Sequence, residues 1–289
     1  MAYLAINGRI LADEGASLSP LDRGFLYGDG LFETLKAEGS RLYFLERHLA
    51  RLQEGARFLR IPFPAELDFA GIIEELRDKN RIRGAASVKI ILSRGKHRGS
   101  LSLHSTSRPT VVILVNPYAA RTGEDWQRGL VVTLEREILQ NASSSLCRLK
   151  SLNYLLYLLV RTRAQEKGFD EAILTNQALE ICECTTSNLF FFRQGRLETP
   201  ALSCGLLPGV LRQALMECLE EAGEPVDEVR IPAEGLLTCE EIFVTNSLVE
   251  ILPVGRVDQD PFPRRERTRK VWERFRAYRD ALHPEEVLR

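Results

Sequence analysis

This chain lacks the features that mark membrane and secreted proteins. Among its 289 residues no stretch reaches the roughly 20 consecutive apolar residues that a membrane-spanning helix needs. Residues 1–15 contain no positive region followed by an apolar run, which is the pattern of a secretory signal. The sequence therefore predicts a cytoplasmic protein without a membrane partner.

Metal-binding residues are also sparse. The six cysteines contain no C-x-x-C pair, and the four histidines are scattered along the chain. Structural zinc sites need such residues in close, paired spacing. We therefore expect no metal ion, and cysteines that are reduced and buried.

The sequence has no excess charge of either sign. A net charge of -1 provides no general attraction to nucleic acid. The segment 264–279 is rich in arginine, but Glu266, Glu273 and Asp280 interrupt it at helical spacing. We interpret it as a solvated surface helix, and a non-enzymatic binding protein that uses this basic tail is the remote alternative.

Turn signals and apolar spacing predict a two-domain α/β protein. Asn7-Gly8 lies between two short apolar runs and predicts a hairpin, and Gly39 marks a second one. Helical spacing follows from Leu45 to Leu59, and β-branched strands follow later. We predict three parts: an N-terminal domain over residues 1–118, a linker over 119–128 and a C-terminal domain over 129–289.

Lys150 stands just before a leucine-rich segment. Four leucines recur there at helical spacing and predict one buried helix face: Leu152, Leu155, Leu156 and Leu159. A lysine beside a buried segment loses solvation, which favours the neutral amine that forms Schiff bases. A solvated surface lysine is the alternative interpretation of Lys150 taken alone.

Three further features have the chemistry of a binding site. In an extended segment, Cys182 and Cys184 share one face and Glu183 points to the other. Gly209 opens a helix whose first amides can bind phosphate, although ordinary N-capping explains the glycine equally well. The basic loop 93–99 can hold a carboxylate or be merely exposed.

The Gly28-x-Gly30 pair looks like part of a dinucleotide-binding fingerprint. Glu33 stands where the third glycine belongs, and no strand precedes the pair. We therefore reject a dinucleotide site.

A lysine, a strand carboxylate, an amide-rich helix start and a basic loop are together what pyridoxal phosphate requires. Their order resembles the class IV aminotransferase family, the fold-type IV pyridoxal-phosphate enzymes. The motifs that carry the resemblance run from Asn7-Gly8 to about Val257: Asp22-Arg23-Gly24 with Tyr27-Gly28-Asp29-Gly30, Phe44 to Leu52, Lys150-Ser151-x-Asn153-Tyr154, Glu183 with Asn188-Leu189-Phe190, and Leu207-Pro208-Gly209-Val210-Leu211-Arg212. The resemblance implies a homodimer with the active site between a smaller N-terminal and a larger C-terminal domain, completed by a loop of the partner subunit.

The resemblance also implies a role for each matching position. Lys150 would form the Schiff base and move a proton, and Glu183 would keep the pyridine nitrogen protonated. Tyr154 would support the lysine or the ring hydroxyl. The phosphate site would comprise Arg51, Val210, Leu211, Asn246 and Ser247. The candidates for the substrate side are Tyr27, Arg94, His97 and Arg98.

One position departs from the pattern of many family members. Leu211 stands where many of them carry threonine, so a hydroxyl contact worth about 1 kcal/mol is missing. Lyase members often carry an apolar residue there, and the run Thr245 to Leu248 also looks lyase-like. We therefore favour 4-amino-4-deoxychorismate lyase, which forms 4-aminobenzoate and pyruvate for folate synthesis, over a branched-chain or D-amino-acid aminotransferase using 2-oxoglutarate.

Overall fold

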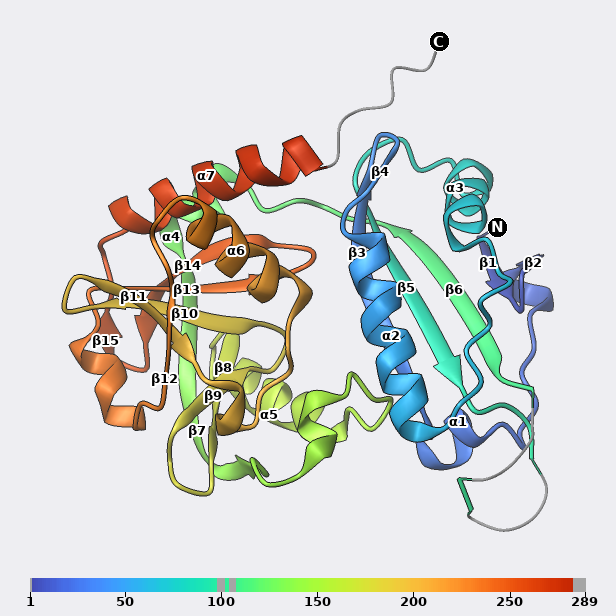
Figure 1. Ribbon diagram of the computed structural model, residues 1–289, viewed down its shortest axis with the longest axis horizontal. Helices are drawn as coiled ribbons and strands as arrows, with labels where there is room; N and C mark the ends of the chain where they lie inside the picture. The colour runs from blue at the N-terminus through green and yellow to red at the C-terminus, as the bar shows by residue number, and fades with distance from the viewer. Residues whose placement is uncertain (1, 98–101, 104–107, 283–289) are drawn as a thin grey trace. The chain divides into compact units, whose positions relative to one another are not determined.

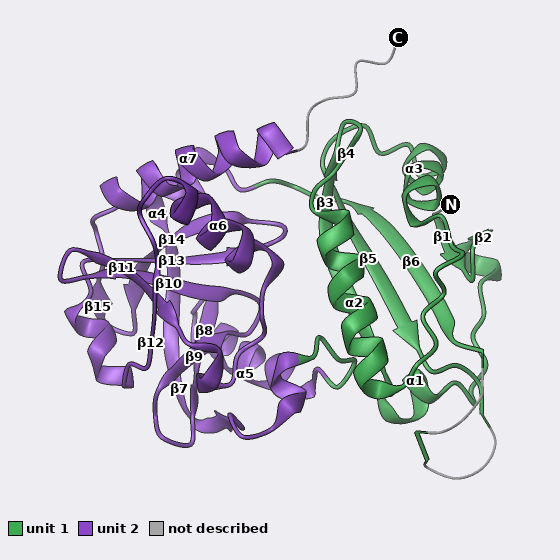
Figure 2. Ribbon diagram, in the orientation of Figure 1, with its two compact units in different colours: residues 1–120, 149–153, 283–289 green, residues 121–148, 154–282 purple. Residues whose placement is uncertain are grey.

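A computed structural model describes residues 2–97, 102–103 and 108–282. It confirms the mixed α/β class, and the chain divides into two compact units (Figure 2). Unit 1 contains the described residues up to 120 together with Leu149–Asn153, and unit 2 contains Arg121–Arg148 and Tyr154–Leu282. The Lys150 segment therefore belongs to unit 1, although we placed it in the C-terminal domain.

The segment 119–128, predicted to be a linker, contains the helix α4 (Gly123–Arg128). Thr122 and Asp125 form a reciprocal capping box at its N-terminus. Each side chain accepts a hydrogen bond from the other residue's backbone amide, which explains why this polar segment is helical.

Unit 1 is built on a six-stranded sheet with antiparallel pairing throughout (Figure 1). Its order is β2-β1-β6-β5-β3-β4. The strands are β1 (Tyr3–Ile6), β2 (Arg9–Ala12), β3 (Gly30–Glu38), β4 (Arg41–Leu42), β5 (Ala86–Ser93) and β6 (Thr110–Pro117). Both predicted hairpins are confirmed, and Asn7 and Gly8 both adopt the positive φ that a tight hairpin turn requires.

Two helices pack on one face of this sheet, α2 (Leu45–Leu59) and α3 (Phe69–Lys79). Alternation along β3 directs Leu31, Leu35 and Ala37 into that core, and β5 contributes the like-facing Val88 and Ile90. Glu33 has the same parity as these leucines, so it faces α2. Phe32 has the opposite parity and lies on the other face of the sheet.

Unit 2 contains a nine-stranded mixed sheet. Its order is β12-β11-β10-β13-β14-β7-β8-β9, with β15 paired to β14. The strands are β7 (Leu130–Gln140), β8 (Glu171–Asn176), β9 (Ile181–Cys184), β10 (Asn188–Arg193), β11 (Arg196–Pro200), β12 (Asp227–Val229), β13 (Glu241–Asn246), β14 (Glu250–Val257) and β15 (Asp260–Pro261). The remaining helices of the unit are α5 (Leu155–Glu166), α6 (Val210–Glu221) and α7 (Glu266–Leu282).

The prediction that one leucine-rich face of this helix is buried is wrong in part. Helix α5 begins at Leu155, and Val160 and Ala164 are its buried residues. Leu155 and Leu159 are 76% and 44% exposed in this chain. Leucines occupy almost every position of the first turns, so spacing alone cannot say which side of the helix meets the core.

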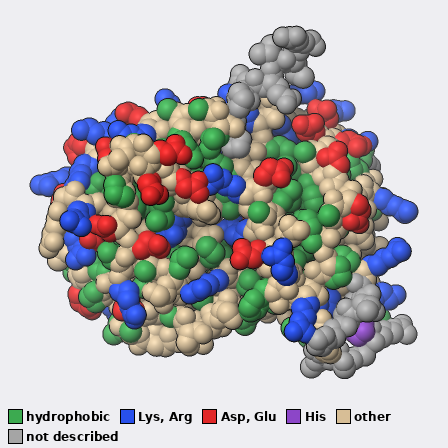
Figure 3. Space-filling view, viewed as in Figure 1, with side chains coloured by type: hydrophobic (Ala, Val, Ile, Leu, Met, Phe, Trp, Pro, Cys, Tyr) green, Lys and Arg blue, Asp and Glu red, His purple; other side chains and the backbone are tan. Residues whose placement is uncertain are grey.

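The arginine-rich tail forms α7, which packs on unit 2 through Val271 and Phe275. Three of its arginines make ion pairs within the unit, with Glu240, Glu224 and Glu250. On the face shown in Figure 3, basic and acidic side chains are interspersed. Among the described helices, none is long and apolar enough to cross a membrane.

Candidate active site

Lys150 lies on an added strand at the edge of β3. The Phe32 amide donates to the Lys150 carbonyl oxygen at 2.8 Å, and the Leu152 amide donates to Gly30 O at 3.0 Å. Ser151 forms a β-bridge with Leu31. These contacts fix the lysine backbone in extended form, so Lys150 precedes the helix rather than opening it.

The Lys150 side chain reaches the face of the sheet that carries Phe32. Its Nζ lies 4.6 Å from the centroid of the Phe32 ring, a cation–π distance. A second lysine, Lys89 of β5, places its Nζ 4.8 Å from the same centroid. We did not single out Lys89 as a site residue, although alternation along two paired strands would have placed it on this face.

On the opposite face of β3, Glu33 binds two side chains of α2. Arg51 donates from Nε and Nη2 to its two oxygens at 2.7 and 2.6 Å, and His48 Nδ1 lies 2.7 Å away. Glu33 and His48 are buried, whereas the Arg51 side chain retains 14% exposure. The predicted phosphate-binding arginine is therefore held in place by a buried carboxylate.

The contacts in this cluster determine which of its groups are charged. Burial raises the pKa of Glu33, but the Arg51 charge and the bonds from His48 and Arg51 outweigh it and lower that pKa to about 2. Burial lowers the pKa of His48, and the charges of Arg51 and Lys150 add to this effect. His48 is therefore neutral, and its Nδ1 carries the proton because the ionised Glu33 can only accept.

In unit 2, Glu183 is buried on β9 and accepts hydrogen bonds from three neutral donors. Tyr157 Oη donates to Oε1 at 3.3 Å. Asn188 Nδ2 and the Leu207 amide each donate to Oε2 at 3.2 Å. These three donors fix the orientation of the carboxylate.

Two tyrosines of the α5 start lie beside this carboxylate. The rings of Tyr154 and Tyr157 stack with centroids 4.7 Å apart. Tyr154 donates to the Thr185 carbonyl oxygen at 2.7 Å, and Gln140 donates to Tyr157 Oη at 2.7 Å. Burial, and secondarily the negative charge of Glu183, raise the pKa of both hydroxyls, so both remain protonated donors.

The start of α6 has the form of an anion site. Its N-cap is Gly209, which has no side chain to accept a hydrogen bond from the first-turn amides. A Cβ at Gly209 would lie 2.0 Å from Asn188 Oδ1, so only glycine allows this approach to the residue that holds Glu183. The predicted ligands Val210 and Leu211 are the first two residues of this helix.

The predicted residues Asn246 and Ser247 lie at the end of β13. The Asn246 side chain closes the following turn, because its Oδ1 accepts from the Leu248 and Val249 amides at 2.9 Å. The neighbouring Thr245 hydroxyl is buried and has no hydrogen-bond partner among the described residues. The sequence analysis did not single out Thr245, whose unpaired hydroxyl suits an oxygen-rich ligand.

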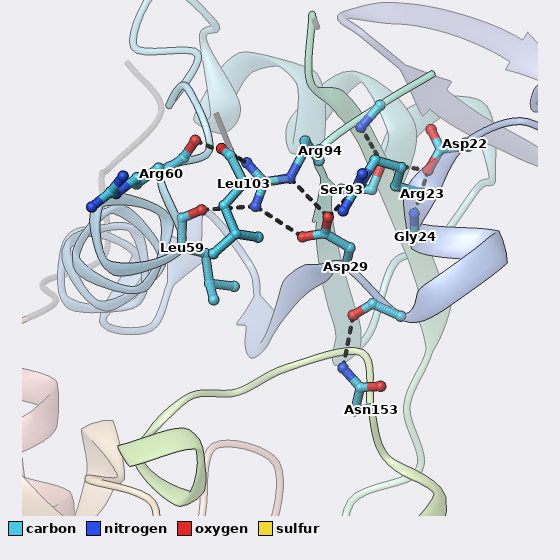
Figure 4. A network of polar contacts seen from close by, with 12 residues as sticks. Asp22, Arg23, Gly24, Asp29, Leu59, Arg60, Ser93, Arg94, Leu103 and Asn153 are labelled. Carbon is cyan, nitrogen blue, oxygen red and sulfur yellow. Dashed lines mark hydrogen bonds and ion pairs between the residues drawn. The ribbon is translucent and has the colours of Figure 1, made fainter. Parts of the chain in front are cut away.

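Arg94 requires a correction. We predicted it on the substrate side, but its side chain is fully buried (Figure 4). All five of its donors are engaged, two of them with Asp29 at 2.8 and 3.0 Å and three with backbone carbonyl oxygens. No donor is left for a substrate carboxylate, so we withdraw Arg94 from the substrate side.

The other substrate-side candidates have different positions. Tyr27 is 51% exposed and lies at the end of helix α1 (Arg23–Tyr27). His97 is half-buried, and its amide donates to Leu21 O at 3.3 Å. Arg98 lies outside the described residues. Tyr27 and His97 remain predictions.

Comparison with known proteins identifies the family. The family model described as amino-transferase class IV matches residues 30–257. A Methanocaldococcus jannaschii protein provisionally named branched-chain-amino-acid aminotransferase is 30% identical, covering 95% of both chains. The aminodeoxychorismate lyase of Bacillus subtilis is 30% identical over 88% of this chain and 86% of its own length.

A solved structure extends the likeness to the fold. The 4-amino-4-deoxychorismate lyase from Pseudomonas aeruginosa is 33% identical and superposes with a TM-score of 0.82. The match covers 95% of this chain and 98% of that one. The chain therefore belongs to the class IV aminotransferase family and is an enzyme of that pyridoxal-phosphate-dependent family.

Proposed function

We propose that this enzyme is a 4-amino-4-deoxychorismate lyase, which converts its substrate into 4-aminobenzoate and pyruvate. The 33% identity to a solved lyase over nearly both whole chains supports this reaction. This identity carries the choice, and the positive charge on the Lys150 face of the unit 1 sheet is compatible with it. Alternation along β3 puts Lys36 on that face, and Lys89 of β5 shares it.

This charge suits the lyase substrate. 4-Amino-4-deoxychorismate carries two carboxylates, and Lys89 supplies a cation beyond Lys150, whereas Lys36 on the same face is ion-paired with Glu38 at 3.5 Å. A branched-chain amino acid carries one carboxylate and an apolar side chain. Because Arg94 is engaged elsewhere, Lys89 is our candidate for the residue that binds a substrate carboxylate. Tyr27 and His97 remain the other candidates for the substrate side.

The residues fit pyridoxal phosphate by their chemistry. When bound, the cofactor supplies an electron-withdrawing ring that stabilises negative charge at the reacting carbon. Lys150 would provide the amine that holds it and would move the proton, and Glu183 would accept the hydrogen bond of the protonated ring nitrogen. The phosphate would be bound by Arg51, by the Val210 and Leu211 amides and by the Asn246-Ser247 turn, and the Thr245 hydroxyl, unpaired among the described residues, suits the same oxygen-rich group.

Two tyrosines orient the groups around Glu183. Tyr154 is anchored by the Thr185 carbonyl and stacks on Tyr157, which in turn donates to Glu183. Both rings therefore hold the acid and exclude water around it. Leu211 contributes its amide but no hydroxyl, which distinguishes this phosphate site from that of family members with threonine there.

An amino-acid aminotransferase is the second candidate, because the archaeal relative covers 95% of both chains. Its co-substrate 2-oxoglutarate also carries two carboxylates, so charge alone does not separate the two reactions. The fate of the proton does. A lyase expels pyruvate and keeps the cofactor as the aldehyde, whereas a transaminase leaves the cofactor as an amine that needs a keto acid.

The deciding experiment supplies 4-amino-4-deoxychorismate to the loaded enzyme without any keto acid. We expect stoichiometric pyruvate and 4-aminobenzoate over many turnovers. Leucine, isoleucine or D-alanine alone should convert little of the cofactor to its amine form. Rapid bleaching by one of these amino acids, reversed by 2-oxoglutarate, would establish the aminotransferase instead.

We also propose a homodimer. Leu155, Leu158 and Leu159 of α5 are 76%, 54% and 44% exposed in the single chain, more apolar surface than one short helix usually leaves in water. Leu158→Glu should convert the dimer to a monomer in light scattering. The control Leu237→Glu, at a leucine 52% exposed elsewhere in unit 2, should leave the mass unchanged.

A further inference from the structure

The glycine motif that precedes β3 forms a docking surface for the lysine segment. We call residues Asp22–Gly30 the glycine corner. A Cβ at Gly28 would lie 2.7 Å from Asn153 Oδ1, and a Cβ at Gly30 would lie 2.5 Å from the backbone oxygen of Leu92 on β5 and 2.7 Å from Leu152 Cδ1. Gly28 also adopts a positive φ of 65°. Both glycines therefore let the residues after Lys150 approach the backbone of the corner.

The backbone carbonyl groups of the glycine corner bind the lysine segment. Gly30 O accepts from the Leu152 amide at 3.0 Å, and Gly28 O accepts from Asn153 Nδ2 at 3.0 Å. Together with the bond from the Phe32 amide to Lys150 O, three hydrogen bonds span Lys150 to Asn153. The path of the lysine backbone therefore depends on the shape of residues 28–30.

A buried ion pair sets that shape. Asp29, between the two glycines, accepts from Arg94 Nε at 2.8 Å and Nη2 at 3.0 Å, and from Arg23 Nε at 2.7 Å (Figure 4). The Arg94 amide also donates to Asp29 O at 3.1 Å. Burial raises the pKa of Asp29, but the bonds and charges of Arg94 and Arg23 outweigh it and keep that pKa below its ordinary value.

Arg94 connects the corner to the end of α2. Its remaining donors bind the carbonyl oxygens of Leu59, Arg60 and Leu103 at 2.7 to 3.1 Å. Leu59 and Arg60 form the C-terminus of the helix that carries Arg51, where carbonyl groups lack helical partners. One guanidinium thus joins the backbone of the corner to that of the helix.

The start of the corner has its own anchor. Asp22 caps α1 through the Gly24 amide at 2.8 Å, and it accepts from the hydroxyls of Ser93 and Thr110 at 2.7 Å each. Ser93 and Thr110 are paired on β5 and β6. Both ends of the corner are therefore tied to the sheet by buried carboxylates.

We propose that the glycine corner, locked by Arg94 and Asp29, is the device that positions Lys150 for reaction. Arg94 and Asp29 are positioning residues, since neither side chain reaches the lysine amine. They act by holding Gly28 and Gly30 where their carbonyl oxygens bind the lysine segment. The catalytic part of this inference rests on the proposed role of Lys150, whereas the effect on its backbone does not.

Asp29→Asn in the loaded enzyme tests this arrangement. Asparagine keeps the size of aspartate but loses the charge that holds two arginines. We expect the amides of Phe32 and Leu152 to exchange hydrogen about tenfold faster, while Val88 and Ile90 in the core of the same sheet change less than about twofold. Turnover should fall about 10- to 100-fold at nearly constant KM, because misplacing a reacting group by an ångström costs rates of this order.

Two further variants make the test specific. Gly28→Ala pushes directly on Asn153 and strains the positive φ of the corner while keeping both side chains of the ion pair, and it should accelerate exchange at Leu152 in the same way. Glu198→Gln breaks a comparable pair, since Glu198 accepts from Arg193 at 2.7 and 3.1 Å, and should change neither the exchange nor the turnover.

Several outcomes would overturn the proposal. Unchanged exchange at Phe32 and Leu152 in both corner variants would refute the positioning of the backbone. Equal acceleration at Val88 and Ile90 would show a general loss of stability instead. Faster exchange with unchanged turnover would refute the catalytic consequence. If Lys150 proves not to hold the cofactor, the exchange measurement still decides the backbone part.

Discussion

Two buried glutamates, Glu33 in unit 1 and Glu183 in unit 2, have opposite surroundings. Glu33 is bonded to the Arg51 guanidinium and to His48, whereas three neutral donors orient Glu183. A carboxylate joined to a guanidinium has its charge compensated locally. One oriented by neutral groups keeps a field that can stabilise a cation, such as a protonated ring nitrogen.

From this comparison we expect Glu33 to be a structural carboxylate and Glu183 a catalytic one. Removing the charge of Glu33 should act mainly on stability and on the placement of Arg51. Removing that of Glu183 should act mainly on rate. The experiments below test this separation, beginning with Lys150.

The largest effect is expected for Lys150→Ala. Borohydride should link the cofactor covalently to Lys150 in the wild type, and the variant should lose this adduct and at least about 10³-fold in turnover, because one amine acts as both nucleophile and proton carrier. Peptide mass spectrometry locates the adduct. Lys89→Ala should keep it and raise KM, and an adduct on Lys89 would contradict the assignment.

The second-largest effect on turnover is expected for Glu183→Gln. With its oxygen in the place of Oε2 the amide still accepts from Asn188 and Leu207, and its NH2 group can donate to Tyr157 Oη, so we expect normal folding and cofactor binding. Turnover should fall about 10²–10³-fold, as when one charged contact at a reaction centre is lost. Steady-state kinetics and thermal melting measure the two properties. Turnover equal to wild type would mean that this carboxylate, like Glu33, is structural.

Glu33→Gln should show the reverse pattern. Lowering the pKa from 4.5 to about 2 corresponds to stability on the order of 3 kcal/mol, which is present above pH 4.5 and lost as the pH falls toward 2. Denaturation at pH 7 should show the variant less stable by about that amount. The gap should narrow below pH 4.5, because the unfolded wild-type chain then binds a proton at this carboxyl that the folded state takes up only near pH 2. A gap independent of pH would contradict this ion pair.

Tyr157→Phe should have the smallest effect. It removes one neutral hydrogen bond from Glu183 and leaves the ring stacked on Tyr154. Loss of about 1 kcal/mol of orientation predicts a fall in turnover of about 3- to 10-fold. A change as large as that of Glu183→Gln would show that the tyrosine hydroxyl takes part in the chemistry itself.

Local patterns in the sequence were sufficient for most of the secondary structure. Asn7-Gly8 predicted its hairpin because few residues adopt two consecutive positive φ angles, and the helix from Leu45 to Leu59 followed from apolar spacing. Long ordered motifs were sufficient for the family, because several of them in sequence rarely coincide by chance. They also singled out Lys150 and Glu183 as candidates, which the experiments above test.

Only the tertiary structure decided what the charged residues contact. Arg94 looked like a substrate cation, but Asp29 and the end of α2, 65 and about 35 residues away along the chain, occupy four of its five donors. The burial of the α5 leucines was mispredicted for the same reason, because apolar spacing identifies a stripe on a helix but not the segment that packs against it. A sequence specifies a side chain's charge and its local direction, whereas its partners come from segments that meet only when the chain is folded.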